Sequence, residues 1–241
     1  MHISVVIPAF NEEKYIGSCL DALQSQTQQP DVIYVVDNNS TDATCRIAEK
    51  YPNVRIVTEA KQGICAATKC GLDVASKHEG IILRCDADCR PSSDWVEKME
   101  QVFLNNPQCA SVTGPGSTYD AHWLVQVLIA TFYMKPYFVL TGLALGYTPL
   151  FGSNFGIRSE EWKNISSETH LASHQNIHDD MDISYHLKEK TIFDSTLVMP
   201  ISARPFRSPK DLPKRYAAGF RSVFLHWPEQ APWHKIADHH K

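Results

Sequence analysis

The sequence predicts an α/β domain with a Rossmann-like, mostly parallel sheet that is flanked by helices and followed by a helical C-terminal elaboration. Short apolar, β-branched segments recur along the first half of the chain, and segments with helical spacing separate them. Continuous apolar segments of this length are typical of parallel strands covered on both faces. Strands that alternate with helices indicate one doubly wound sheet with right-handed crossovers.

The first half of the chain supplies the strands and helices of this sheet. We expect strands at residues 3–7, 32–36, 54–57, 81–83 and 109–113. One helical stripe contains Tyr15, Ile16, Cys19, Leu20 and Leu23, and a second contains Ile64, Ala67, Gly71, Val74 and Ala75. Polar residues at 40–42 and 92–94 are suited to start further helices after the second and fourth strands.

The composition is that of one globular domain. The chain has 241 residues, of which 43% are apolar and 21% are charged, and its formal net charge is −4. A nucleic-acid-binding protein would normally carry a basic excess, so we expect no nucleic-acid partner. The chain opens on a predicted strand, so no secretion signal is expected. Seven scattered cysteines, with no CxxC pair, predict reduced thiols rather than disulfides or a cysteine-bound zinc.

Residues 124–150 form a long apolar region that Lys135-Pro136 divides. Without that division the region would be long enough to span a bilayer. A charge and a proline near its middle favour a break in the helix instead of a continuous span. Three interpretations stay open: a buried helical hairpin or core helix, a membrane-interface or re-entrant element that meets a lipid-linked acceptor, and a transmembrane helix.

Polar and acidic residues follow the predicted strands, at the sheet edge where ligands of such folds bind. No GxGxxG follows the first strand, which disfavours a nicotinamide enzyme. The most informative segment is Asp86-Ala87-Asp88, directly after the fourth strand. Two carboxylates so close together offer the hard oxygen ligands that Mg²⁺ and Mn²⁺ prefer, and such ions share their coordination with phosphate oxygens. Alone, the motif would be as consistent with a solvated turn.

An ordered set of motifs gives these acids a context. The segments at residues 5–13, 35–42, 63–72, 86–88, 152–158 and 179–183 together resemble the inverting family 2 glycosyltransferases of GT-A fold. The resemblance covers roughly residues 3–190. It implies one GT-A domain over residues 1–241, with a nucleotide-sugar-binding half at 1–114, an acceptor and catalytic half at 115–200, and a basic, aromatic tail at 201–241.

The resemblance also implies roles for individual residues. Pro8, Phe10 and Glu12 would line the nucleotide base and ribose, and Asp37 would hold the base edge. Asp88 would be the principal ligand of Mn²⁺ or Mg²⁺, with Asp86 on the metal or the ribose. The other positions implied at the nucleotide are Asn39, Gly63, Lys69 and Ala87, where Asn39 replaces a glycine because asparagine tolerates a left-handed backbone.

Asp180 is the expected catalytic base. In an inverting transfer the acceptor hydroxyl attacks opposite the leaving nucleotide, so a carboxylate must lie beside that hydroxyl. The family usually has Glu-Asp at this site and this chain has Asp179-Asp180, which leaves the choice between them open, with Asp180 favoured by position. The same acids also suit the start of a helix, where the macrodipole stabilises carboxylates. No Gln-x-x-Arg-Trp motif occurs, which favours single addition over polymerisation.

The C-terminal region is basic and rich in histidine. Between Arg204 and Arg221 the six cations Arg204, Arg207, Lys210, Lys214, Arg215 and Arg221 stand against the single acid Asp211. They would close over the pyrophosphate, contact anionic lipid, or form a solvated helix face. His170, His174 and His178 are spaced by four, which on a helix would place them on one face and suit a metal. Alternatively, the polar residues 166–176 form an acceptor loop. His226 is a candidate additional ligand of the catalytic metal, as in some GT-A enzymes.

The expected function is therefore the transfer of a sugar, from a UDP-sugar or a similar donor, to a hydroxyl of a glycan or a lipid-linked acceptor. A cytoplasmic location, with peripheral contact at the inner face of an anionic membrane, fits that function. Two rivals stay open. A sugar nucleotidyltransferase would need a glycine- and arginine-containing loop after the first strand, which residues 8–13 lack. A non-catalytic membrane-associated binding protein would have no reason to keep Asp86, Asp88 and Asp180.

Overall fold

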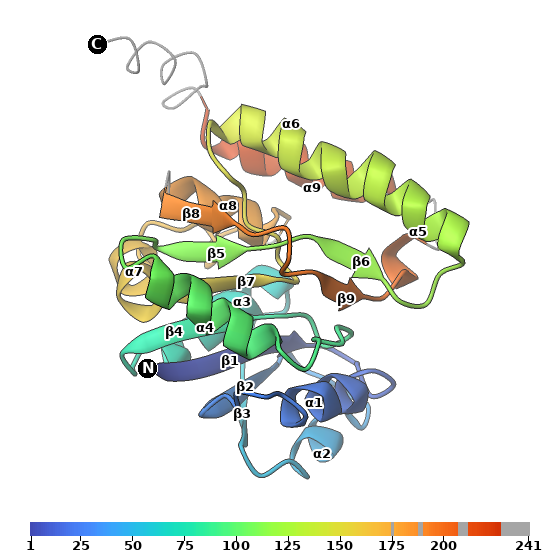
Figure 1. Cartoon of the computed structure of the whole chain (residues 1–241), viewed down its shortest axis with the longest axis vertical. Helices are drawn as coiled ribbons and strands as arrows, with labels where there is room; N and C mark the ends of the chain where they lie inside the picture. Colours follow the sequence, from blue (N-terminus) through green and yellow to red (C-terminus); the bar gives the residue numbers. More distant parts are fainter. Residues whose placement is uncertain (175, 188–189, 207–211, 228–241) are drawn as a thin grey trace.

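A computed structural model of the chain describes residues 1–174, 176–187, 190–206 and 212–227. It confirms the predicted α/β class, with a seven-stranded sheet in the order β3-β2-β1-β4-β7-β5-β8 (Figure 1). Only β7 runs antiparallel to its neighbours in this sheet. The strands are β1 (His2–Ala9), β2 (Val32–Asp37), β3 (Val54–Thr58), β4 (Gly80–Arg84), β5 (Ser111–Thr113), β7 (Phe155–Arg158) and β8 (Thr191–Phe193). The five strands expected from the sequence are all present.

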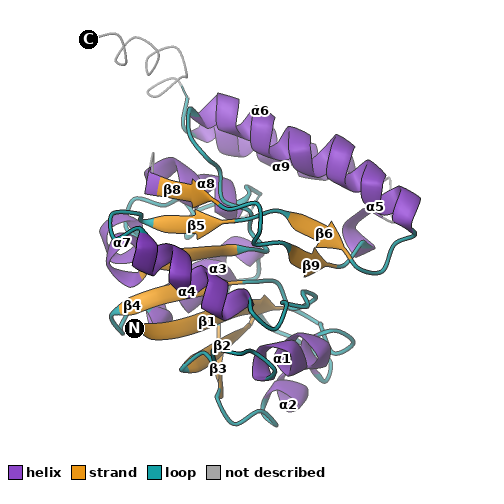
Figure 2. Ribbon diagram, in the orientation of Figure 1, coloured by secondary structure: helices purple, strands orange, loops and turns teal. Residues whose placement is uncertain are grey.

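Helices cover both faces of this sheet (Figure 2). On one face, α1 (Ile16–Gln24) and α4 (Trp95–Asn105) pack against Ile3, Val5 and Ile7 of β1. On the other, α3 (Ile64–Ala75), α7 (Ser159–Ile165) and α8 (Asp179–Leu187) pack in a second apolar cluster. A short helix, α2 (Thr44–Ala48), lies beside α1. A small parallel sheet of β6 (Gly116–Thr118) and β9 (Met199–Ile201) adjoins the main one.

Helix α3 buries Ala67, Gly71 and Ala75 of its predicted apolar stripe, but not Ile64. The stripe places Ile64 in the core, but Ile64 is 43% exposed, because the first turn of α3 opens onto the carboxyl ends of the strands. Gly71 is where the helix approaches the sheet most closely. A Cβ atom there would lie 2.4 Å from Val6 Cγ1 and 2.7 Å from Val36 Cγ2, so only glycine fits without movement.

The expected interruption at Lys135-Pro136 is absent. One continuous helix runs through α5 (Trp123–Ile129), a π-helical segment η1 (Ala130–Met134) and α6 (Lys135–Leu145). The π-helical turn directly before Pro136 shifts the hydrogen-bond register there, so the helix continues through the proline. The buried-hairpin interpretation is therefore wrong: in the most apolar window of this helix, only 17% of residues are buried.

The helix α5–α6 and the C-terminal helix α9 (Leu212–Leu225) form a separate layer beyond the β8 edge (Figure 1). The two helices flank one apolar cavity. By length and composition, α5–α6 is also sufficient to cross a membrane. Of the basic tail, Arg207, Lys210 and Asp211 lie outside the described residues, as do the side chains of Lys214 and Arg215.

Candidate active site

A cavity of about 360 Å³ opens at the carboxyl ends of β1 and β4. This is the position at which ligands bind in open α/β sheets. Its lining comes from segments far apart in the sequence: Pro8, Ala9, Phe10, Glu12, Asn38, Gln62, Gly63, Ile64, Ala67, Asp86, Ala87, Asp88, Ser153, Ile201, Ser202, Arg204 and Pro205. The chain thus assembles a single pocket from six separate segments.

Asp86 and Asp88 form the acidic wall of this cavity. Asp86 accepts hydrogen bonds from Arg84, at 2.9 Å, and from the Ser153 hydroxyl. The carboxylate of Asp88 is largely buried. Burial and the nearby charge of Asp86 raise the pKa of Asp88 to about 6, although Arg204 acts in the opposite direction. A raised pKa means that the surroundings favour the neutral carboxyl, and a cation beside it would favour the ionised form instead.

Arg204 supplies one cation to this wall. It lies in a short 3₁₀ helix, η3 (Arg204–Phe206), after β9, and donates 2.9 and 2.8 Å hydrogen bonds to Glu12. Its Nη2 also lies 3.0 Å from Asp88 Oδ2, and its guanidinium stacks over Tyr15. The carboxylates of Glu12 and Asp88 thus bind one positive charge between them.

The donor set fits a hard divalent cation. Ligand atoms of Asp86, Asp88 and Cys89 lie within 4.8 Å of one another. Burial raises the pKa of the Cys89 thiol well above its usual range, which makes the two carboxylates the better candidate ligands. Carboxylate oxygens are the ligands that Mg²⁺ and Mn²⁺ take together with phosphate.

A second acidic pair lies behind the cavity, at the start of α8. Asp179 accepts hydrogen bonds from Thr68 Oγ1 at 2.7 Å and from Arg84 Nη2 at 3.3 Å. Because Arg84 also pairs with Asp86, one buried guanidinium joins the two acidic motifs. The helix start expected at residues 179–182 is therefore present, and its first turn carries the acidic cluster.

Asp180 is enclosed by three hydrogen-bond donors. Its Oδ2 accepts from Gly152 N at 2.8 Å and from the Tyr137 hydroxyl at 3.0 Å, and its Oδ1 accepts from Met181 N. Burial, and then the charge of Asp179, raise the pKa of Asp180. Gly152 contacts Asp180, and the next residue, Ser153, lines the cavity. A single peptide segment therefore separates the Asp180 carboxylate from the cavity.

Seven of the residues expected at the site line this cavity: Pro8, Phe10, Glu12, Gly63, Asp86, Ala87 and Asp88. Asp37 and Asn39 lie in the adjoining loop. The Asp37 carboxylate accepts from Ser40 N, and Asn39 has the left-handed backbone expected of it, with a φ of 66°. Between them, Asn38 lines the cavity and accepts a 2.7 Å hydrogen bond from Gly63 N.

Lys69 and the histidines lie away from this pocket. Lys69 pairs with Asp73 one turn along α3, at 2.8 Å. His226 is not placed as a ligand of the catalytic metal, because its Nε2 lies 3.0 Å from Asp182 instead. His170 contacts the same carboxylate, whereas His174 is exposed and bonds to Ser173. The spacing of four residues does not bring these histidines onto one helix face, because residues 170–174 and 176–178 are not helical.

Four residues at or beside the site were missed from the sequence: Arg84, Asn38, Ser153 and Tyr137. A signal existed for Arg84, because a charged residue within an apolar strand needs buried partners. Ser153 lay inside a recognised motif without an assigned role. Tyr137 gave no signal, since its contact with Asp180 depends on how α6 packs.

Comparison with known proteins identifies the family of this chain. A family profile described as "Glycosyl transferase family 2" matches residues 4–159. The chain is 38% identical over 103 residues to glycosyltransferase AglE of Haloferax volcanii, covering 40% of this chain and 33% of that protein. It is 30% identical over 124 residues to a Methanococcus voltae protein named dolichyl N-acetyl-α-D-glucosaminyl phosphate 3-β-D-2,3-diacetamido-2,3-dideoxy-β-D-glucuronosyltransferase, covering 46% of this chain and 38% of that one. The chain thus spans about a third of the length of these two relatives.

Solved structures show the same fold. Mannosyltransferase PcManGT from Pyrobaculum calidifontis, in complex with GDP-Man and Mn²⁺, aligns with a TM-score of 0.65 at 20% identity, covering 93% of this chain and 63% of that one. TarS of S. aureus, in complex with UDP, aligns with a TM-score of 0.67 at 18% identity, covering 98% and 68%. The fold is thus of the GT-A type. Because the family profile covers well over half of the residues, the chain belongs to glycosyl transferase family 2.

Proposed function

We propose that this protein is an inverting, metal-dependent glycosyltransferase that moves a sugar from a nucleotide donor, a UDP-sugar, to a hydroxyl of a lipid-linked acceptor. The observation that carries this proposal is the cavity with Asp86 and Asp88 on its wall and Asp180 directly behind it. Arg84 holds the two acidic motifs in a fixed relation.

The cavity provides the donor site. Phe10, half exposed at its mouth, offers an aromatic face to the base, and Pro8 and Glu12 lie beside it. Asp37, Asn39 and Lys69 do not line the cavity, so their expected roles depend on how the loops close on the donor. Asp88, with Asp86, would hold Mn²⁺ or Mg²⁺. When bound, the ion neutralises the charge that develops on the departing diphosphate.

Asp180 is the proposed base. Asp179 pairs with the Arg84 cation, whereas the three groups that donate to Asp180 carry no charge, so we favour Asp180 as the acid that takes the proton. A raised pKa makes Asp180 a stronger base than an ordinary aspartate. The Tyr137 hydroxyl bonds to Asp180 Oδ2 at 3.0 Å, in the manner expected of an acceptor hydroxyl. We infer that the acceptor displaces or joins this phenol.

An apolar cavity of about 530 Å³ supports a lipid-linked acceptor. It lies between α5–α6 and α9, and its lining includes Tyr137 and Met181, which both contact Asp180. The surrounding helices expose several large apolar side chains: Trp123, Leu124, Val125, Val127, Leu128, Phe132, Val139, Leu140, Leu143, Phe220 and Phe224. Exposed apolar area of this extent marks an interaction surface. The Methanococcus relative carries a dolichyl phosphate substrate in its name.

This surface would place the enzyme at the cytoplasmic face of a membrane. We expect the protein to float with lipid vesicles, and Leu140→Ser with Phe220→Ser to remove that binding. Leu104→Ser is the matched control, since Leu104 is 52% exposed but lies on α4. Equal flotation of neutral and anionic vesicles would show that the basic residues contribute little. A wild-type protein that stays in the soluble fraction would contradict the lipid-linked acceptor.

The catalytic proposal is tested by transfer from a panel of nucleotide sugars, with Mn²⁺, to polyprenyl-linked and free sugar acceptors. Asp180→Asn should keep donor binding but lose transfer by several orders of magnitude. Asp94→Asn, which removes a surface acid paired to Lys98 on α4, is the control and should remain active. A fully active Asp180→Asn variant would assign the base elsewhere.

A further inference from the structure

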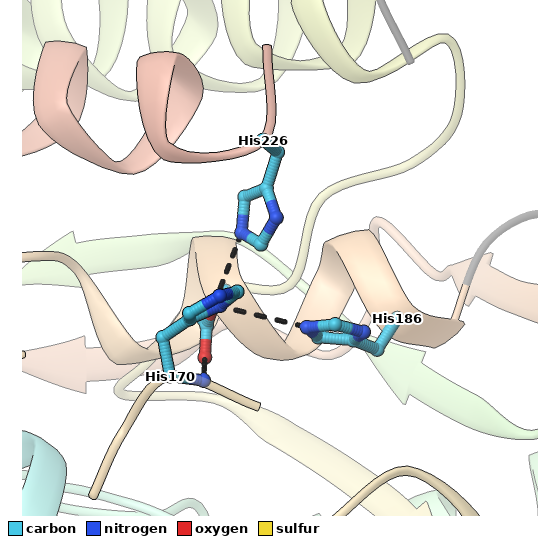
Figure 3. Close-up of side chains that lie close together, drawn as sticks. His170, His186 and His226 are labelled. Carbon is cyan, nitrogen blue, oxygen red and sulfur yellow. Dashed lines mark hydrogen bonds and ion pairs between the residues drawn. The ribbon is translucent and has the colours of Figure 1, made fainter. Parts of the chain in front are cut away.

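Three histidines and one aspartate converge on one point outside the donor cavity. Figure 3 shows the imidazole rings of His170, His186 and His226 directed toward one another. The ligand atoms of these histidines and of Asp182 all lie within 4.8 Å of one another. They come from three segments: the loop before α8, α8 itself, and the end of the chain's last described helix.

Hydrogen bonds within this cluster leave one buried ring nitrogen, His186 Nε2, without a partner among the described residues. His170 Nδ1 and His226 Nε2 each lie 3.0 Å from Asp182 Oδ1, which uses both lone pairs of that oxygen. Asp182 Oδ2 accepts from His170 N at 2.8 Å. His186 Nε2, 3.9 Å from Oδ1, is buried without a hydrogen-bond partner among the described residues. A buried polar nitrogen in this state is costly unless something binds it.

We propose that His170, His186, His226 and Asp182 bind a structural Zn²⁺ ion, separate from the metal of the donor site. Three imidazole nitrogens and one carboxylate oxygen are ligands that zinc accepts, whereas Mg²⁺ prefers oxygen alone. Zinc bonds of about 2.0–2.1 Å in a tetrahedron place ligand atoms about 3.3 Å apart. The observed separations of 3.0, 3.0 and 3.9 Å from Asp182 Oδ1 lie around that value.

The surroundings of the cluster suit a closed structural site. The side chains of Asp182, His226 and His186 are 0%, 5% and 10% exposed, and that of His170 is 32% exposed. The Glu168 carboxylate lies 3.6 Å from His186 Nδ1, on the side of the ring away from Nε2. A carboxylate in that position favours a proton on Nδ1 and leaves Nε2 free to bind metal. With Asp182 as fourth ligand, no position remains open for catalysis.

Zinc at this point would fix α9 to α8. The Tyr185 ring stacks on His226 at 3.6 Å, and Ser222 Oγ accepts from His178 N at 2.8 Å. These contacts align the two helices, and the ion would join them through His226. Since α9 forms one wall of the apolar cavity, zinc would preserve the shape of that cavity.

The test is metal content and metal-induced stabilisation of the full chain, prepared without a histidine tag. We expect about one Zn²⁺ per chain, retained through dialysis, and intense visible absorption from tetrahedral Co²⁺ after substitution. His186→Phe should keep the melting temperature of the metal-free protein, because His186 Nε2 has no hydrogen-bond partner in the part of the chain that the structure describes. It should lose the upward shift that Zn²⁺ gives to the wild type.

His174→Ala is the matched control, since His174 lies beside His170 but is exposed and outside the four ligands. It should bind Zn²⁺ like the wild type. Asp88→Asn should also retain Zn²⁺, which separates this site from the donor metal. The proposal is overturned if His186→Phe binds Zn²⁺ as the wild type does, if Asp88→Asn loses it, or if bound Co²⁺ gives the weak spectrum of an octahedral ion.

Discussion

Replacing Asp88 with asparagine should make the protein more stable and less able to bind its donor. Asp88 is buried beside Asp86, and its pKa is raised from an ordinary 3.8 to about 6. The ionised carboxylate is thus disfavoured in the folded state. The protonated carboxyl of Asp88 therefore stabilises the folded state. This stabilisation is fully present below pH 3.8 and is lost as the pH rises through about 6. A neutral amide at this position does not ionise, so Asp88→Asn avoids this loss.

The expected gain follows from the size of the pKa difference. At about 1.4 kcal/mol for each pKa unit, the difference between 3.8 and about 6 corresponds to at most about 3 kcal/mol at pH 7.5. About half of that loss has already developed at pH 5. The variant should therefore exceed the wild type by up to about 3 kcal/mol at pH 7.5 and by about half as much at pH 5.

Urea unfolding at both pH values, followed by circular dichroism without added divalent cation, measures these differences. Asp94→Asn is the control, because its lysine and serine partners lower the pKa of Asp94 and the same substitution should give no gain there. The reasoning fails if Asp88→Asn is less stable than the wild type at pH 7.5, or if its gain does not grow between pH 5 and 7.5. Either result would mean that Arg204 fully compensates the Asp88 charge.

Three further substitutions test the site and the fold. Tyr137→Phe removes a donor that favours ionised Asp180, so the acid limb of the pH–rate profile should move to higher pH; an unchanged limb would contradict Asp180 as the base. Arg84→Met leaves buried carboxylates without their cation and should cost about 3–5 kcal/mol in urea unfolding at pH 7.5, with a smaller loss at acid pH; a loss that does not depend on pH would point to packing. Gly71→Ala forces a Cβ against Val6 and should lower the free energy of unfolding by about 1–3 kcal/mol, whereas a neutral result would mean that α3 shifts freely.

Local sequence patterns predicted the sheet well because each strand is a continuous apolar segment. Residues 3–7 and 32–36 are buried on both faces, so every side chain contributes to the signal. The same logic placed Asp86 and Asp88 after β4 and therefore on the cavity. Strand β7 was not identified as a strand, because Phe155–Arg158 is short and its antiparallel pairing with β4 is set by tertiary structure.

Patterns were less informative where a contact joins distant segments. Pro136 was expected to interrupt its helix, but a π-helical turn absorbs it, and no local signal distinguishes the two outcomes. His170 was grouped with His174 and His178 by spacing. Its actual partners, His186 and His226, are brought to it by the packing of α8 and α9. Arg204 was recognised as basic, yet its place between Glu12 and Asp88 depends on β9 returning to the donor cavity.

The most direct test of the account is the titration of UDP into the protein, by calorimetry, with and without Mn²⁺. We expect binding that depends on Mn²⁺, that weakens at least tenfold in Asp88→Asn, and that is unchanged in Asp94→Asn. Binding should also weaken as the pH falls below about 6, because protons then compete with the metal for Asp88. UDP binding of equal strength without Mn²⁺, or in Asp88→Asn, would contradict the claim that these carboxylates hold the donor through a metal.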